Sequence, residues 1–197
     1  MNEFRLFAVA TVLAISAPAA MAQQNANIRG VITAFEGNVI SIKANDGSAI
    51  SVDLPEAVAV AITKPFSMAD VKPGMKLGVT TIRRADGATV AIDVRPIPAA
   101  VNEGLSSYDL QPQSTMTNAV LEATAQASGA DEITLNYKTG TVKVLVPPGT
   151  PMSQSAPGAR ADMKAGETIF IAARKEEGGK LVAARVQVSK DGVKPTQ

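Results

Sequence analysis

The sequence predicts an all-β protein with two tandem small barrels of five strands each. Two observations favour this fold class. Short segments rich in valine, isoleucine and threonine alternate apolar and polar residues, and turns that contain glycine separate them. The same arrangement also occurs twice, because "MADVKPGMKLGV" at residues 68–79 resembles "RADMKAGETIFI" at residues 160–171.

The N-terminal residues 1–22 are predicted to be a secretory signal peptide. Residues 6–15 are almost entirely apolar, and Ala20 and Ala22 place small side chains where a signal peptidase reads them. The apolar stretch is shorter than the roughly 20 residues of a membrane-spanning helix. Cleavage after Ala22 leaves 197 − 22 = 175 residues, which we expect to be periplasmic or secreted without a membrane span. An uncleaved anchor is the alternative.

The amino-acid composition excludes several kinds of chemistry. The chain has no histidine and no cysteine, so Ser-His-Asp and Cys-His catalysis, zinc sites built from imidazole or thiolate, and disulfides are excluded. We therefore assign no catalytic residue, no metal ligand and no cofactor. A net charge of +1, 4% aromatic residues and no tryptophan give little reason to expect nucleic acid as a partner.

The internal repeat defines the expected domains. Asp70 matches Asp162 and Gly74 matches Gly166, in both cases 92 residues apart (162 − 70 = 166 − 74 = 92). We predict two copies of one domain, at residues 28–97 and 117–190. The same offset relates further pairs, namely Ile50 with Val142, Val52 with Val144, Pro55 with Pro147, Val90 with Val182 and Val94 with Val186.

Each copy is predicted to contain five strands. In the first copy they are "VITAF", "VISIK", "ISVDL", "MKLGVTTIRR" and "TVAIDVR". Asp46-Gly47 and Asp86-Gly87 have the residues of tight hairpin turns. In the second copy the strands are "AVLEATAQ", "EITLNYK", "TVKVLV", "ETIFIAARK" and "LVAARVQV".

A very short helical turn is expected between the third and fourth strands of each copy. Ser67 and Asp70 have the spacing of a capping box, and Pro73-Gly74 ends the turn at once. Five strands with such a turn are typical of an OB-like barrel. A pair of small sandwiches is the alternative, but a domain of this size tolerates open sheet edges poorly.

The connector at residues 98–116 joins the two predicted domains. It is mostly small and polar, with Tyr108, Asp109 and Leu110 as an island within it. Tyr108 and Leu110 could dock the connector between the barrels. Alternatively, Tyr108 and Asp109 could line a ligand site there, since inter-domain clefts are common binding sites. The tail at residues 191–197 is predicted to be disordered.

Several segments together resemble a family. They are Ile28-Arg29-Gly30-Val31, the Lys72-Pro73-Gly74 turn, "YDLQPQSTMTNA" at residues 108–119 and "SKDGVKP" near the end. The chain resembles small exported bacterial proteins of unknown function that automated naming often calls metal ABC transporter permeases. The resemblance implies two tandem OB-like domains. The residues do not support the name, because a permease needs several membrane-spanning helices.

Acidic residues at turns are candidates for metal binding or catalysis. Asp70 and Asp162 are expected to stabilise the start of their helical turns, because a carboxylate there accepts hydrogen bonds from free backbone amides. No segment has the dense acidic spacing of a calcium loop. Arg83 and Arg174 near the ends of the fourth strands are candidates for an anionic-ligand site, or else charges that protect the strand ends.

The preferred prediction is therefore an exported, non-enzymatic binding or scaffold protein. Its partner would be a protein or a small molecule of the periplasm, held in the barrel grooves or in the cleft between domains. A carboxylate-based envelope hydrolase is one alternative. A periplasmic metal-handling protein with oxygen ligands is another.

Overall fold

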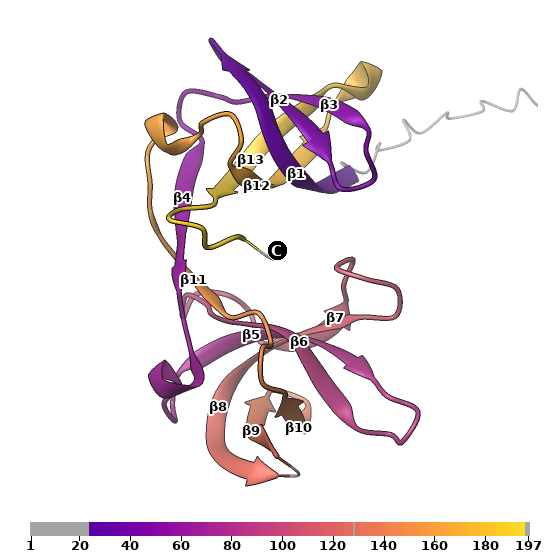
Figure 1. The fold of residues 1–197 in the computed structure, drawn as a ribbon. Coiled ribbons are helices and arrows are strands. Elements are labelled where there is room, and N and C mark those ends of the chain that lie inside the picture. The colour runs from indigo at the N-terminus through magenta and orange to yellow at the C-terminus, as the bar shows by residue number, and fades with distance from the viewer. Residues whose placement is uncertain (1–23, 128, 196–197) are drawn as a thin grey trace, which may run out of the picture.

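The computed structural model describes residues 24–127 and 129–195. The predicted signal peptide lies outside this range. The chain is all-β, as predicted (Figure 1). Within the described residues, no helix is long and apolar enough to span a bilayer. Of the tail predicted to be disordered, residues 191–195 are described and Pro195 is buried, and residues 196 and 197 lie outside the described range.

The strands form two sheets. Sheet A has the order β11-β4-β13-β12-β1-β2-β3, and sheet B has the order β5-β6-β10-β9-β8-β7. Sheet A contains β1 (Gln24–Glu36), β2 (Val39–Ala44), β3 (Ala49–Asp53), β4 (Ala59–Pro65), β11 (Ser153–Pro157), β12 (Thr168–Lys175) and β13 (Leu181–Val188). Sheet B contains β5 (Lys76–Arg83), β6 (Thr89–Pro96), β7 (Gly104–Ser107), β8 (Thr115–Ala127), β9 (Ala130–Tyr137) and β10 (Gly140–Val146).

Five strands of sheet B close into a barrel. β5 pairs with β6 on one side and with β8 on the other, which joins the two ends of the row β5-β6-β10-β9-β8. In sheet A, Val182 of β13 pairs with Asp53 of β3, so the ends of the equivalent row β13-β12-β1-β2-β3 also meet. Closure provides hydrogen-bond partners for backbone groups at strand edges that would otherwise be open.

The two halves exchange strands, which differs from the predicted tandem domains at residues 28–97 and 117–190. β1 pairs with β12 near the C-terminus, with Ile28 opposite Ile171. β5 pairs with β8, with Leu77 opposite Ala119. Apart from β4 and β11, each copy of the repeat therefore gives three strands to one sheet and two strands to the other.

The exchange follows from β4 and β11, which were not predicted as strands. They pair antiparallel with each other, from Ser153 opposite Pro65 to Pro157 opposite Ala61. Because both are extended, they carry the chain away from the three strands just completed and into the other sheet. Figure 1 shows them running side by side between the upper and lower halves.

The repeat itself is visible in the structure. β5 and β12 differ by 92 residues at both ends (168 − 76 = 175 − 83 = 92), and so do β6 and β13 (181 − 89 = 188 − 96 = 92). The 3-10 turns η1 (Met68–Asp70) and η2 (Arg160–Asp162) share this offset and lie between β4 and β5 and between β11 and β12. A third turn, η3 (Glu177–Gly179), joins β12 to β13.

The acids of the first two turns have structural contacts. Asp70 accepts hydrogen bonds from the backbone amide of Ser67 at 3.0 Å and from its hydroxyl at 2.8 Å. Asp162 accepts from the amide of Ala159 at 2.9 Å and from Lys190 Nζ at 3.0 Å. These bonds satisfy backbone donors at the start of a turn, as the sequence predicts.

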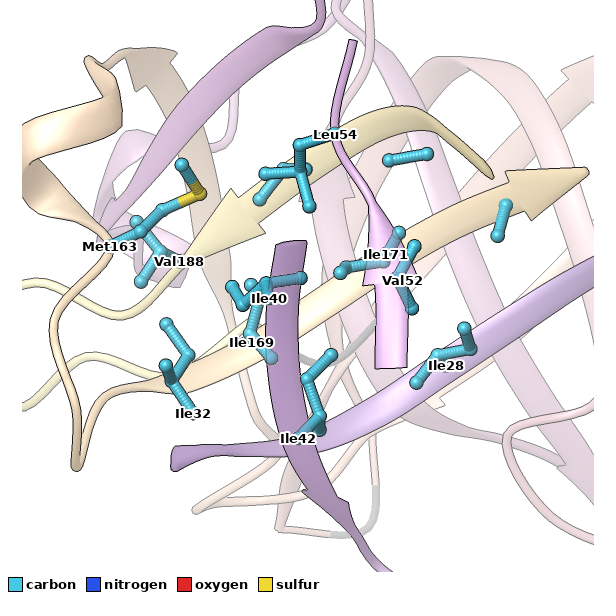
Figure 2. Close-up of a cluster of buried hydrophobic side chains, with 13 residues drawn as sticks. Ile28, Ile32, Ile40, Ile42, Val52, Leu54, Met163, Ile169, Ile171 and Val188 are labelled. Atoms are coloured by element: carbon cyan, nitrogen blue, oxygen red, sulfur yellow. The ribbon is translucent and has the colours of Figure 1, made fainter. Parts of the chain in front are cut away.

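Each half has its own apolar core, and each core mixes residues from both copies. Figure 2 shows that Ile28, Ile40 and Ile42 from the first copy pack with Ile169 and Ile171 from the second. The core of sheet B is built in the same way, with Leu77, Val79 and Val94 beside Leu121, Ile133, Leu135 and Val144. Burial of these side chains is the main source of stability in a chain without disulfides.

Candidate functional site

A cleft of about 820 Å³ lies between the two sheets. Both halves and the connector line it, so it exists only because the halves face each other. Its charged and polar lining includes Asn27, Arg95, Ser106, Asn118, Gln154 and Arg185, and its apolar lining includes Val60, Ile97, Val101, Tyr108, Met116 and Phe170.

Because side chains alternate along a strand, the arginines of this region lie on faces directed away from the cores. On β13, Val186 is in the core of sheet A, so its neighbour Arg185 is directed to the other face. On β6, Val94 is in the core of sheet B, and Arg95 is directed away from it in the same way. The two outward faces meet at the cleft.

Arg29 on β1 is held between two aromatic rings. Its guanidinium carbon is 5.6 Å from the ring centre of Tyr108 and 5.2 Å from that of Phe170. Arg185 lies 5.4 Å from the ring centre of Phe170, and Arg95 lies 6.0 Å from that of Tyr108. All four distances suit cation–π contacts. The two rings thus gather three cations from three strands.

The connector is fastened to this cluster by Asp109. Arg29 Nη2 donates to Asp109 Oδ1 at 2.9 Å, and Asn27 Nδ2 donates to Asp109 Oδ2 at 3.1 Å. Arg29 Nη2 also donates to the Tyr108 hydroxyl at 3.4 Å. Burial alone would raise the pKa of Asp109, but these hydrogen bonds and the charge of Arg29 lower the pKa below its ordinary value.

Tyr108 therefore fits both hypotheses made for it. It docks the connector on Arg29, and its ring also lines the cleft. Asp109 contacts Arg29 and Asn27 and is not among the cleft-lining residues. Leu110 lines a separate pocket of about 310 Å³ together with Arg29, Gln111 and Pro195.

Arg95 forms a buried ion pair with Asp93, two residues away on the same strand. Arg95 Nη2 also lies 3.6 Å from the sulfur of Met116. A Cβ at Gly78 on the adjacent strand would lie close to Ile97 Cγ2, at 3.0 Å, and to Asn118 Oδ1, at 3.2 Å, and would be in ordinary contact with Arg95 Nε at 3.5 Å. The pair fixes Arg95 at the side of the cleft formed by sheet B.

Arg185 is the exposed arginine of the cleft. The surrounding protein removes part of its hydration, and the like charge of Arg95 acts in the same direction, so the pKa of Arg185 lies below its ordinary value despite the influence of Tyr108. Arg185 from sheet A and Arg95 from sheet B are thus close enough for their charges to influence each other.

The buried Nε of Arg29 has no hydrogen-bond partner within the described part of the chain. The Nη2 atom of the same guanidinium donates to Asp109, and Arg29 also lines the pocket of about 310 Å³. The pKa of Arg29 is lowered by burial, but its bonds to Asp109 and Tyr108 outweigh burial and leave the pKa raised. Arg29 therefore remains charged and holds the connector.

Two predicted site residues lie elsewhere. Arg83 and Arg174 are exposed near the ends of β5 and β12, and neither is among the residues that line the cleft. The arginines that do gather were missed because each is a single charge on an alternating strand. The sequence does place these arginines on the strand faces directed away from the cores. This position indicates a shared site only when it is known that the two outward faces meet.

The acidic residues do not gather as a metal site would require. Within residues 24–127 and 129–195, no group of three or more acids is close enough to hold a metal ion. Comparisons of the chain with protein-family models, with curated proteins and with solved structures find no match. Function therefore has to be inferred from the residues of the cleft.

Proposed function

We propose that this chain is an exported, non-enzymatic binding protein that holds its ligand in the cleft between sheets A and B. The observation that carries the proposal is the cleft of about 820 Å³ in which both sheets and the connector present side chains. Its volume is in the range of small-molecule sites, which span about 300–1,000 Å³.

The cleft has the mixed lining of a binding site. Val60, Ile97 and Val101 offer apolar surface, while Asn118 and Gln154 offer amide groups that can orient a ligand. The contacts of Arg29 with Tyr108 and Asp109 hold the connector in place. A site that is already ordered loses less conformational entropy when a ligand binds.

Each half is proposed to be an OB-like barrel assembled by strand exchange. Five paired strands and a short turn before the fourth strand support this interpretation. In this proposal the grooves of the separate barrels are not the binding site. The space between the barrels has that role, and the paired strands β4 and β11, which carry the chain from one sheet to the other, keep its two walls together.

The proposal is tested with a variant that fills the cleft. Ser106 is small, exposed and lines the cleft, so S106W should block it. Ser51 is an exposed serine on β3 that does not line the cleft, so S51W is the matched control. The mature protein is screened against a metabolite library by thermal shift, because a ligand that binds only the folded state raises the melting temperature.

The expected result is that at least one compound stabilises the unaltered protein and S51W, but not S106W. Native mass spectrometry of the same mixtures should show one bound molecule per chain. Two results would contradict the proposal. One is a library without any hit. The other is a hit that stabilises S106W as strongly as it stabilises S51W.

A further inference from the structure

A second pocket, of about 330 Å³, lies beside the turn η1, where β9 begins and β10 ends. We call this space the η1 pocket. Met68 of η1, Asp131 of β9, Met152 and the turn at residues 147–150 line it, and Asp131 is the one charged residue of its lining. The η1 pocket shares no lining residue with the cleft, so it is a separate site.

The internal repeat shows which group lies at the equivalent place in the other half. The counterpart of Met68 is Arg160 of η2 (160 − 68 = 92). Arg160 Nη2 donates to Asn38 Oδ1 at 2.8 Å, and Arg160 Nη1 donates to the carbonyl of Pro55 at 3.1 Å. The guanidinium carbon lies 5.2 Å from the ring centre of Phe35. Beside η2, the protein therefore binds a guanidinium of its own.

The η1 pocket keeps an acceptor but has no such donor. Leu54 N donates to the carbonyl of Asn38 at 2.7 Å, and Val146, the counterpart of Leu54 (146 − 54 = 92), lies opposite Asp131 in the register of β9 and β10. Asp131 is therefore the counterpart of Asn38. A carboxylate replaces the amide acceptor, and the thioether of Met68 replaces the guanidinium.

The hydrogen bonds around the η1 pocket leave Asp131 able to bind a cation. Asp131 Oδ1 accepts from the neutral amide Nε2 of Gln126, so Oδ2 can accept from another donor. The carbonyl of Pro147 accepts from Thr150 Oγ1 at 2.8 Å, which replaces the bond that Arg160 makes to Pro55. A bound cation would therefore be held chiefly by Asp131.

We propose that the η1 pocket binds a guanidinium group from outside the chain. The group donates to Asp131, and its flat faces lie against Met68 and Met152, which are both partly exposed. A carboxylate accepts two parallel bonds from a guanidinium, and these charge-assisted bonds are stronger than those of the neutral Asn38. This site goes beyond the function proposed for the cleft and does not depend on it.

The test compares two small probes of nearly the same shape. Butylguanidinium has a planar cation, and butylurea has a planar neutral group on the same alkyl chain. NMR of the protein with ¹³C-labelled methionine methyl groups reports binding at Met68 and Met152, whose signals are assigned with M68L and M152L. We expect saturable shifts of both signals with butylguanidinium, and affinity for butylurea that is weaker by about tenfold or more.

Variants locate the site. D131N should weaken butylguanidinium by about tenfold, while E122Q is the matched control, because Glu122 is exposed in the same half and does not line the pocket. M68R should abolish binding, since its guanidinium would occupy the pocket as Arg160 occupies the equivalent place. M68L should retain binding. Circular dichroism of each variant verifies that it is folded.

The source of the guanidinium is tested with capped tripeptides that carry arginine or its neutral isostere citrulline between two glycines. Preference for the arginine peptide over both butylguanidinium and the citrulline peptide would support a polypeptide as the source. Equal binding of the arginine peptide and butylguanidinium would support a small molecule. Both results support a guanidinium site.

Four results would overturn the proposal. They are equal affinity for butylguanidinium and butylurea, equal loss for D131N and E122Q, undiminished binding to M68R, and no shift of either methyl signal at about 50 mM butylguanidinium. S106W should bind butylguanidinium as the unaltered protein does. Failure of the cleft as a ligand site would therefore leave this proposal standing, and the reverse also holds.

Discussion

The five-stranded rows of sheet A and sheet B are built from equivalent strands, and their inner faces are more alike than their cleft faces. Equivalent core positions have similar side chains in both halves. Ile169 and Leu77 correspond, as do Ile171 and Val79, Val186 and Val94, and Ile40 and Ile133, and all of them are buried. In each pair, the two side chains fill equivalent positions of the two cores and have nearly the same volume.

The faces that meet at the cleft differ at the same offset. Phe170 in sheet A corresponds to Gly78 in sheet B, and Arg185 corresponds to Asp93 (170 − 78 = 185 − 93 = 92). Because Arg29 lies opposite Phe170 and Asn118 lies opposite Gly78, these two residues correspond as well. The cleft therefore has unlike walls, although the two halves have like cores.

This difference shows which faces of the strands are constrained by packing of the core and which are available for other roles. The inner faces have one requirement, which is to fill a barrel, and both copies meet it. The outer faces are free to differ, and here they place an arginine and aromatic cluster on one wall and a buried ion pair on the other.

The largest predicted effect concerns the shared cores. Ile40 and Ile133 are both fully buried at equivalent positions, so I40A and I133A should each lower the free energy of unfolding by about 2–5 kcal/mol. Urea titration followed by circular dichroism measures this. A control is V39A, at a residue that is 41% exposed, which should have little effect. A large loss for only one of the isoleucines would contradict equivalent cores.

A smaller effect on the free energy of unfolding should distinguish β4 from β11, the two strands that carry the chain between the sheets. Thr63 on β4 is buried; its hydroxyl donates to the carbonyl of Val188 at 3.0 Å and accepts from Gln187 Nε2 at 3.2 Å. T63V should cost about 1–3 kcal/mol, because buried polar groups lose a partner. The equivalent residue on β11 is Ser155, which is exposed, so S155A should cost little. Similar unfolding free energies for T63V and S155A would contradict this difference between β4 and β11.

The smallest effect concerns the connector. Asp109 and Arg29 form an ion pair that water partly screens, so D109N should cost about 0.2–1 kcal/mol at pH 7. The pKa of Asp109 is lowered in the folded state. Its contribution is therefore present above the unfolded pKa of about 3.9 and is lost as the pH falls through the lower folded pKa.

This pH dependence provides the measurement. Urea titrations of D109N and of the unaltered protein at pH values between about 7 and 3 should give a stability difference that shrinks toward acid pH. D191N, which alters an exposed aspartate of the tail, is a suitable control. A difference that stays constant or grows as the pH falls would exclude the assigned ion pair.

Much of the fold could be predicted from the sequence, because alternation, turn residues and the repeat offset identified ten strands. Strands β4, β7 and β11 were missed. β4 and β11 each end in a proline, and both lie where the pattern predicts a connection. The exchange could not be predicted, because β1 pairing with β5 or with β12 would bury equivalent apolar faces. The repeat makes both pairings locally equivalent, and only the path of β4 and β11 distinguishes them.

The site could be predicted in part. Tyr108 and Asp109 were singled out because they belong to an apolar and aromatic island in a small polar connector, and of the two only Tyr108 is among the residues that line the cleft. Arg29, Arg95 and Arg185 were not, because each is a single charge on an outward strand face, which usually means a solvated side chain. Their convergence depends on how the two halves face each other, and this is a property of the exchanged fold.

The exchange of strands underlies the shape of the cleft, and disulfide trapping tests it most directly because the chain has no cysteine. Val31 lies opposite Thr168 in the antiparallel register of β1 and β12, where Cα atoms are typically about 4.5–5.5 Å apart and can be bridged. A tandem barrel would instead place Val31 opposite Lys76, which is equivalent to Thr168 (168 − 76 = 92). Intact-mass measurement after mild oxidation should show an intrachain disulfide in V31C/T168C and free thiols in V31C/K76C. The reverse pattern would contradict the exchanged fold.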